Sequence, residues 1–331
     1  MKMKTLKEFI CNPLPTDNCH ASTVLPLPDG SVVAAWFGGT KEGKDDVDIW
    51  FARRDENGWC EAKTISRNKG IPHWNPVLFL RKNGEIVLFF KVGKVIPSWR
   101  TYFSISTDGG RTFSQPQELV KGDRSGGRGP VKNKCLRLSD GRVLAPASTE
   151  LKGWQCFVDT SFDDGATWEK SPKVKTEQTC AMLNSLNGFT SNKIPMIQPT
   201  LWESAPGKVH MLTRTPVSKV YRSDSDDYGK TWCRAYETDL LNSNSGLDLV
   251  KTPDGAIYLV SNPVGGNWGE RSPLTLQKST DNGATWETIL TFEEEKIDSE
   301  FSYPAVEYMN GSLYVTYTYE RINVAFWKVD L

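Results

Sequence analysis

Two of the three histidines in this sequence, His20 and His73, occupy equivalent places in a repeated pattern. Each lies shortly before a turn that contains a glycine, Gly30 or Gly84, and the turn is followed by an apolar, β-branched segment. Histidine is the side chain most often used to transfer protons near neutral pH. The pair therefore predicts either acid–base catalysis at a shared site or two polar residues in a wide, wet channel.

A set of cations forms a second pattern. Burying several cations requires anions nearby. The anions could be internal carboxylates such as Asp48, Glu150 and Asp248, or the carboxylate of a substrate, which arginine binds in a bidentate manner. We favour a substrate carboxylate because the cations concentrate between residues 128 and 271. The five cations are Arg128, Lys132, Lys134, Arg214 and Arg271.

The elements that must position these residues are marked by a repeat. Four segments share the pattern Ser-x-Asp-x-Gly-x-Thr followed by Trp or Phe, and they begin at intervals of 55, 64 and 54 residues. The Asp can accept hydrogen bonds from the backbone amides that follow it, and the Gly tolerates the left-handed conformation of a hairpin turn. The four segments are 106–113, 161–168, 225–232 and 279–286, and a degenerate copy covers 52–59.

Six glycine turns, each followed by an apolar strand, run in parallel with these boxes. A unit of strand, glycine turn, strand, crossing, strand, Asp-box turn and strand corresponds to one four-stranded propeller blade. The sequence therefore predicts an all-β, six-bladed β-propeller with antiparallel blades in one domain over 1–331. The sixth unit lacks an outer strand, and residues 4–10 are predicted to supply it and close the ring. The turn glycines are Gly30, Gly84, Gly141, Gly207, Gly255 and Gly311.

Bulk properties exclude several function classes. The formal net charge is zero, which argues against a nucleic-acid partner or a charged membrane surface. No stretch approaches the roughly 20 apolar residues of a membrane-spanning helix, and the N-terminus lacks the apolar core of a secretory signal. The seven scattered cysteines predict reduced core thiols in a cytoplasmic protein. No spacing typical of a metal site is present, so we expect neither a metal nor a cofactor.

The Asp boxes and the six units resemble the sialidase superfamily, whose members are also called BNR-repeat proteins. The resemblance covers nearly the whole chain and implies the propeller fold. Sialidases hold the substrate carboxylate with three arginines, and Arg214 and Arg271 match two of them. The resemblance also implies an acid–base aspartate in the first blade, for which we choose Asp46, while Asp45 and Asp48 stay possible.

Three departures from the sialidase pattern predict different chemistry. His20 stands where the first of the three arginines is expected. The catalytic tyrosine of sialidases is polarised by a glutamate, and Gln198 stands at the position of that glutamate, where an amide cannot act as a base. Tyr303 is the candidate for the tyrosine itself, and without a glutamate its phenol stays protonated near neutral pH.

Together these features predict a glycan-active enzyme, an exo-acting glycoside hydrolase that cleaves a terminal acidic sugar from an oligosaccharide or glycoside. His20 and Asp46 are the expected proton-transfer groups, and Trp36, Trp74 and Trp154 are expected to stack on sugar rings. One alternative is a polysaccharide lyase that cleaves a rhamnose–glucuronate type of linkage by histidine-centred β-elimination. Another is a non-catalytic glycan-binding propeller, although the many titratable groups favour an enzyme. The candidate catalytic residues are His20, Asp46, His73 and Tyr303, and the candidate substrate-binding residues are Trp74, Arg128, Lys132, Lys134, Glu150, Gln198, Arg214, Asp248 and Arg271.

Overall fold

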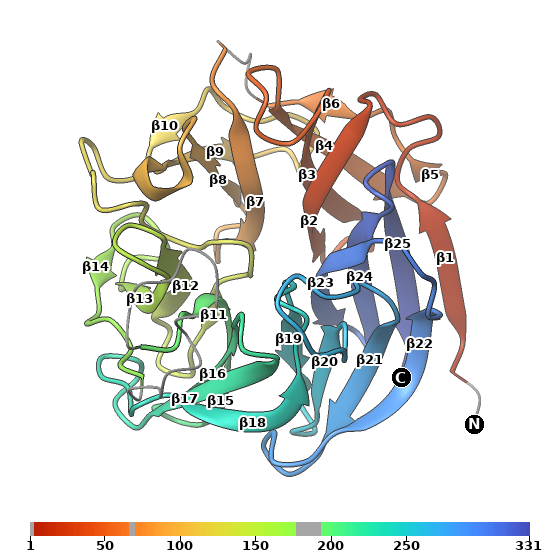
Figure 1. The fold of residues 1–331 in the computed structure, drawn as a ribbon. Helices are drawn as coiled ribbons and strands as arrows, with labels where there is room; N and C mark the ends of the chain where they lie inside the picture. The colour runs from red at the N-terminus through yellow and green to blue at the C-terminus, as the bar shows by residue number, and fades with distance from the viewer. Residues whose placement is uncertain (1–2, 66–69, 177–192) are drawn as a thin grey trace.

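Six antiparallel β-sheets surround a central axis and form a six-bladed β-propeller, which confirms the predicted fold class. The computed structural model describes residues 3–65, 70–176 and 193–331. Figure 1 shows the first strand of each blade nearest the centre. No helix in the described ranges is long and apolar enough to cross a membrane.

The blades follow one another in chain order. Blade 1 consists of β2 (Asn18–Pro26), β3 (Val32–Gly39), β4 (Asp48–Asp55) and β5 (Gly58–Trp59), and β6 (Lys63–Thr64) pairs with β4. Blade 2 consists of β7 (His73–Leu80), β8 (Ile86–Val92), β9 (Arg100–Ser106) and β10 (Gln117–Glu118). Blade 3 consists of β11 (Leu136–Arg137), β12 (Val143–Thr149), β13 (Gln155–Ser161) and β14 (Glu169–Lys170). Blade 4 consists of β15 (Ile197–Ala205), β16 (Lys208–Arg214), β17 (Lys219–Ser225) and β18 (Tyr236–Leu241). Blade 5 consists of β19 (Asp248–Lys251), β20 (Ile257–Ser261), β21 (Leu274–Ser279) and β22 (Glu287–Glu293).

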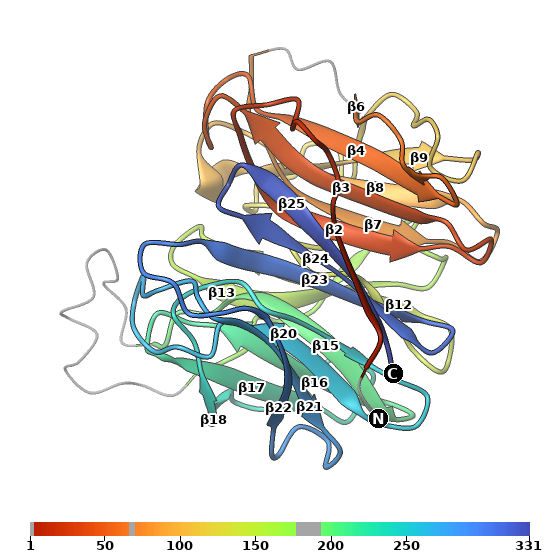
Figure 2. The same cartoon turned by 90° about the vertical axis from the view of Figure 1, so that its right-hand side faces the viewer.

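The sixth blade is built from both ends of the chain. It contains β23 (Phe301–Met309), β24 (Ser312–Tyr319) and β25 (Asn323–Asp330), and its outer strand is β1 (Thr5–Phe9), which pairs antiparallel with β25. Figure 1 shows β1 along the outer side of this blade, and Figure 2 shows the same blade from the side. The prediction that residues 4–10 close the ring is confirmed, because β1 pairs with the edge of β25 that would otherwise be unpaired.

The Asp boxes form the expected hairpin turns. In the box of blade 2, Asp108 accepts hydrogen bonds from the hydroxyls of Ser106 (2.8 Å) and Thr112 (2.5 Å). Burial alone would raise the pKa of Asp108, but these hydrogen bonds outweigh it and lower the pKa to about 2. The aromatic residue that ends a box packs against the preceding blade: the ring of Trp168 lies 6.0 Å from that of Phe89 on β8. The boxes therefore fix the outer ends of the blades and their packing on neighbours.

Residues with a left-handed backbone occur near the start of the inner strand in five of the blades. Ala21, Asn75, Gln198 and Tyr303 have left-handed backbones with φ of 53°, 44°, 54° and 54°, and Lys132 in blade 3 has φ of 70°. At the first four positions the pairing with the second strand shifts register, as in a β-bulge. A bulge redirects a side chain out of the regular alternation, and strained backbones of this kind concentrate at functional sites.

The cysteines agree only partly with the expected core thiols. All six cysteines in the described residues are free. Cys19, Cys135 and Cys156 are buried, as predicted, whereas Cys60 and Cys233 are exposed. Cys180 lies outside the described residues.

Candidate functional site

A pocket of about 440 Å³ opens at one mouth of the central funnel. Every blade contributes to it, through the starts of inner strands, the ends of second strands and the loops beside them. Among the predicted site residues, His20, Trp74, Glu150, Gln198, Arg214, Arg271 and Tyr303 line it.

Arg214, the last residue of β16, is a buried cation whose hydrogen-bond partners are all neutral. Its side chain is only 2% exposed. Nε donates to Oδ1 of Asn244 (2.7 Å), and Nη1 donates to Oε1 of Gln198 (3.2 Å) and to the phenol oxygen of Tyr303. No carboxylate in the described part of the chain lies within ion-pair distance of the guanidinium, although Glu150 lies close enough to feel its charge. The pocket therefore offers an incompletely compensated positive charge to an anion.

Two tryptophans enclose the same guanidinium. The central carbon of Arg214 lies 5.4 Å from the ring centres of both Trp154 and Trp268. Trp154 donates its indole N–H to Oε2 of Glu150 (2.9 Å). Burial raises the pKa of Glu150, opposed by that hydrogen bond and by the charge of Arg214. Glu150 is therefore a carboxyl group that holds a proton more readily than an exposed glutamate.

The other two arginines of the pocket are neutralised by protein carboxylates. Arg271 donates to Oε1 of Glu300 (2.5 Å), and Nε of Arg321 donates to Oε2 of the same carboxylate (2.7 Å). Nη1 of Arg321 also pairs with Glu42. Burial raises the pKa of Glu300, but the charges of Arg271 and Arg321 outweigh this and lower it. These two arginines and two glutamates carry no net charge, whereas no carboxylate of the described residues pairs with Arg214.

His20 is a buried imidazole in the wall of the pocket. Its Nδ1 lies 2.9 Å from Oγ1 of Thr318, and its ring lies 4.1 Å from that of Tyr303. Burial lowers its pKa well below the ordinary value of 6.5, and the charges of Arg321 and Arg271 lower it further. No residue of the described ranges hydrogen-bonds to Nε2 of His20, which leaves this nitrogen available to a ligand.

Gln198 and Tyr303 meet across the funnel, as the family resemblance implied for their positions. The amide nitrogen of Gln198 lies 3.4 Å from the phenol oxygen of Tyr303. The amide cannot take the proton of the phenol, whereas the guanidinium of Arg214 places positive charge against the same oxygen. Tyr303 is thus held by a neutral donor and a cation rather than by a carboxylate.

Three of the predicted residues lie deeper in the funnel. Nζ of Lys132 donates to Oδ1 of Asn133 (2.8 Å) and to backbone carbonyls, and burial lowers the pKa of this lysine to about 7. Lys134 pairs with Asp248 at 2.7 Å. Lys134 also lines a second pocket of about 370 Å³, toward the other end of the inner strands. These side chains connect blades below the first pocket and do not line it.

The remaining predicted residues also lie outside the lining of the pocket. Arg128 forms a 3.0 Å ion pair with the fully buried Asp159, so an internal carboxylate compensates it. His73 lies 3.1 Å from Asp48. Asp46 is exposed and accepts hydrogen bonds from the backbone and hydroxyl of Thr40 at 2.9 and 3.0 Å.

Asp45 and Trp36, which were also expected to take part in the site, lie outside the lining of the pocket. Asp45 is exposed and pairs with Lys94 at 2.7 Å. Trp36 is fully buried in the core of blade 1, so the expectation that it stacks on a sugar is wrong.

Several residues that line or complete the pocket were not among the candidate site residues, including Glu42, Trp268, Glu300 and Arg321. Arg321 and Glu300 are recognisable only as polar residues at strand ends. Trp268 lies within the glycine-rich segment 265–269, where an isolated tryptophan was the available signal. Among the described residues, no group of three or more His, Cys, Asp or Glu side chains could hold a metal ion.

The sequence matches a family model described as a BNR repeat-like domain over residues 30–315. No curated protein sequence is detectably similar to it. The fold is similar to that of the Hadza microbial sialidase Hz136, with a TM-score of 0.77 and 16% identity over 96% of this chain and 66% of that one. The NanB sialidase of Streptococcus pneumoniae is similar with a TM-score of 0.73 and 12% identity, over 96% of this chain and 69% of that one. A protein of unknown function from Dyadobacter fermentans is similar with a TM-score of 0.72 and 15% identity, over 95% of both chains.

Proposed function

Because this chain belongs to the BNR repeat-like family and has a sialidase-like propeller, we propose that it is a glycan-active enzyme that hydrolyses the bond to a terminal, carboxylate-bearing sugar. One observation carries the proposal: Arg214 is buried in the wall of the pocket, and its direct partners are all neutral. A buried guanidinium without an acidic partner is costly unless an anion completes it. A sugar carboxylate has the charge and the planar shape to do so.

In the hydrolytic reaction, two groups of the pocket would move protons. Glu150, whose pKa is raised by burial, would donate its proton to the glycosidic oxygen as the bond from that oxygen to the anomeric carbon breaks. His20, neutral with a free Nε2, would accept a proton from the water that attacks the same carbon. This assignment replaces Asp46, which is exposed and bonded to Thr40.

A second candidate reaction, β-elimination from a uronate, is favoured by the contact of His20 with Tyr303. Arg214 would neutralise the uronate carboxylate, which makes the proton on the adjacent carbon easier to remove. His20 would take that proton, a carbon–carbon double bond would form, and the bond to the leaving oxygen would break. Tyr303, whose phenol already contacts Arg214, would return a proton to the leaving oxygen.

Product analysis separates the two reactions. The protein is incubated with disaccharides that end in N-acetylneuraminate or glucuronate and with a rhamnose–glucuronate disaccharide, and the products are identified by mass spectrometry. Products that together contain one added water support hydrolysis, and an unsaturated uronate supports elimination. His20→Ala should reduce turnover at least 100-fold in either reaction, and Tyr303→Phe should do so only if the reaction is elimination, while Phe162→Ala, on an exposed Asp-box turn, serves as the matched control. Binding of these sugars without any product would instead support a glycan-binding propeller.

A further inference from the structure

Trp268 is a large aromatic side chain held out of the core at the edge of the pocket. It is 62% exposed, although tryptophan is usually well buried in folded proteins. It lies in the connection between β20 and β21, and its backbone has a left-handed φ of 57°. A bulky residue in this conformation is strained, so the surroundings must hold it there.

The loop around Trp268 is fixed by hydrogen bonds to blade 4 and its exit segment. The backbone N–H of Gly266 donates to the hydroxyl of Ser218 (2.9 Å), and that of Gly269 donates to the carbonyl of Ser243 (3.2 Å). The loop also closes tightly on itself, because a Cβ atom on Gly269 would lie 2.7 Å from the carbonyl oxygen of Gly265. The indole is therefore presented in a defined place.

The same loop is connected to the anion site. Asn244 donates to Oδ1 of Asn267 (2.7 Å), the residue before Trp268, and accepts the hydrogen bond from Nε of Arg214. The ring of Trp268 lies 6.5 Å from that of Trp154 at 80°, an edge-to-face arrangement. Part of the indole thus contacts Arg214 and Trp154, and the rest faces solvent at the mouth of the pocket.

We propose that Trp268 is a stacking platform for the sugar ring next to the acidic sugar, so that the substrate is an oligosaccharide of at least two rings. This inference rests on the proposed function, because it assumes that the carboxylate of the terminal sugar lies on Arg214. The second ring then extends from the pocket toward the mouth, where the exposed face of the indole matches the apolar face of a pyranose ring. An aromatic side chain can provide such a contact at little entropic expense.

The test compares ligands with and without the second ring. The ligands are the methyl glycosides of glucuronate and N-acetylneuraminate, and the disaccharides in which the same sugars are joined to galactose. Calorimetry in a His20→Ala background, which prevents turnover, provides Kd for each ligand with the otherwise unmodified protein, Trp268→Ala, Trp268→Phe and Phe162→Ala. Trp268→Ala should weaken binding of the disaccharide about tenfold more than binding of the methyl glycoside, which corresponds to about 1.4 kcal/mol. Trp268→Phe should restore most of the difference, and Phe162→Ala should change neither Kd.

The outcomes distinguish this inference from the proposal it rests on. Equal weakening of both ligands by Trp268→Ala would mean that Trp268 only supports Arg214, and would overturn the platform. Unchanged binding of both ligands would overturn it as well. If the otherwise unmodified protein binds none of the four acidic ligands, the proposed function itself fails.

Discussion

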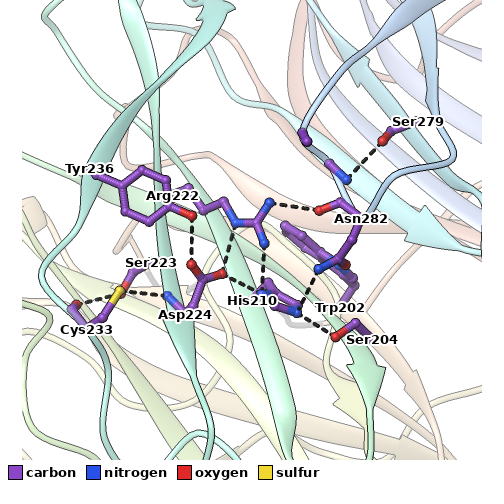
Figure 3. Close-up of polar contacts among 12 residues, drawn as sticks. Trp202, Ser204, His210, Arg222, Ser223, Asp224, Cys233, Tyr236, Ser279 and Asn282 are labelled. Atoms are coloured by element: carbon purple, nitrogen blue, oxygen red, sulfur yellow. Dashed lines mark hydrogen bonds and ion pairs between the residues drawn. The ribbon is translucent and has the colours of Figure 1, made fainter.

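Two arginines on adjacent strands of blade 4 illustrate how alike residues serve different ends. Arg222 on β17 donates from Nε to Oδ1 of Asp224 (2.9 Å) and from Nη1 to the carbonyl of Asn282 in the next blade (2.7 Å), and its guanidinium lies 5.0 Å from the ring of Trp202. Figure 3 shows these contacts. Arg214 on β16 is also enclosed by tryptophan, but its direct partners are an asparagine, a glutamine and a tyrosine. Arg222 is neutralised by Asp224 within an internal network, whereas the guanidinium of Arg214 has no carboxylate partner among the described residues.

The network around Arg222 also contains a serine, a histidine and an aspartate in contact. The Oγ of Ser204 lies 2.7 Å from Nε2 of His210, and Nδ1 of His210 contacts Asp224 (Figure 3). The order resembles a nucleophilic triad. However, the imidazole stacks on Trp202 at 4.8 Å, and Asn282 donates to the same Nε2 at 3.3 Å. Both ring nitrogens of His210 already have hydrogen-bond partners within the protein. The cluster therefore connects blades 4 and 5 and is not a catalytic site. Residue types alone therefore do not mark a site, whereas an uncompensated charge beside an open volume does.

The largest effects come from removing each arginine in turn. Arg214→Ala should reduce kcat/KM for an acidic glycan at least 100-fold, because the anion loses its buried counter-charge. The same change should leave the free energy of unfolding unchanged or increase it, since an incompletely compensated buried charge disappears. Steady-state kinetics and urea denaturation measure the two quantities.

Arg222→Ala is the matched change and should behave in the opposite way. It should lower the free energy of unfolding by about 2 kcal/mol, because Asp224 and Asn282 lose a partly buried partner. Turnover by the folded protein should stay unchanged. A loss of stability in Arg214→Ala equal to that in Arg222→Ala would contradict the distinction between the two arginines.

Gln198→Glu would sharpen the comparison by giving Arg214 the carboxylate it lacks. The new carboxylate would lie where the amide oxygen now accepts from Nη1 at 3.2 Å. An internal ion pair would then compete with the ligand, and Kd for a sugar carboxylate should rise about tenfold. Gln117→Glu, on the exposed outer strand of blade 2, makes the same change in net charge as a control. Tighter binding by Gln198→Glu would show that the ligand does not rely on the charge of Arg214.

The fold could be predicted because its signals are local and repeated. Each Asp box depends on hydrogen bonds within about six residues, and each glycine turn on the residues beside it, so both are visible in the sequence. The same logic located the starts of the inner strands and thus His20, Gln198 and Tyr303. A further local signal was present but unused: Asn75, Gln198 and Tyr303 each precede a proline at the bulge. A left-handed residue before proline is disfavoured, and its recurrence indicates a special backbone.

The charge balance of the site could not be predicted, because partners come from distant parts of the chain. Arg128 is compensated by Asp159, and Arg321 by Glu42, which lies 279 residues away in the sequence. Nothing in the residue types distinguishes Arg128 from Arg214 until the strands are placed in space. Three of the five cations between residues 128 and 271, Arg128, Lys134 and Arg271, pair with protein carboxylates, so the expected substrate carboxylate stays a prediction that rests on Arg214.

The pH dependence of stability distinguishes His20 from an ordinary exposed histidine. Its pKa is lowered in the folded protein by burial and by Arg321, Arg271 and Arg214, so below pH 6.5 the unfolded chain binds a proton that the folded protein does not. Stability should therefore fall as pH decreases from about 7 to 5, by at most about 1.4 kcal/mol per pH unit from this group. His20→Gln should flatten this slope in urea denaturation measured across that range. An identical slope in the variant would mean that His20 binds its proton equally well in the folded protein and in the unfolded chain.

The smallest expected effect on stability comes from a change in the network around Arg222. The phenol of Tyr236 donates to Oδ2 of Asp224 (2.7 Å), and this bond, with those from His210 and Arg222, outweighs burial and lowers the pKa of Asp224 to about 2. Tyr236 is 43% exposed, so solvent replaces part of the lost bond in Tyr236→Phe. The free energy of unfolding at pH 7 should fall by about 0.5–1 kcal/mol. The difference should shrink as the pH approaches 2, because a protonated Asp224 accepts the bond less strongly. A constant difference across pH would assign the effect of Tyr236 to packing, and turnover should be unaffected because the network serves only to join two blades.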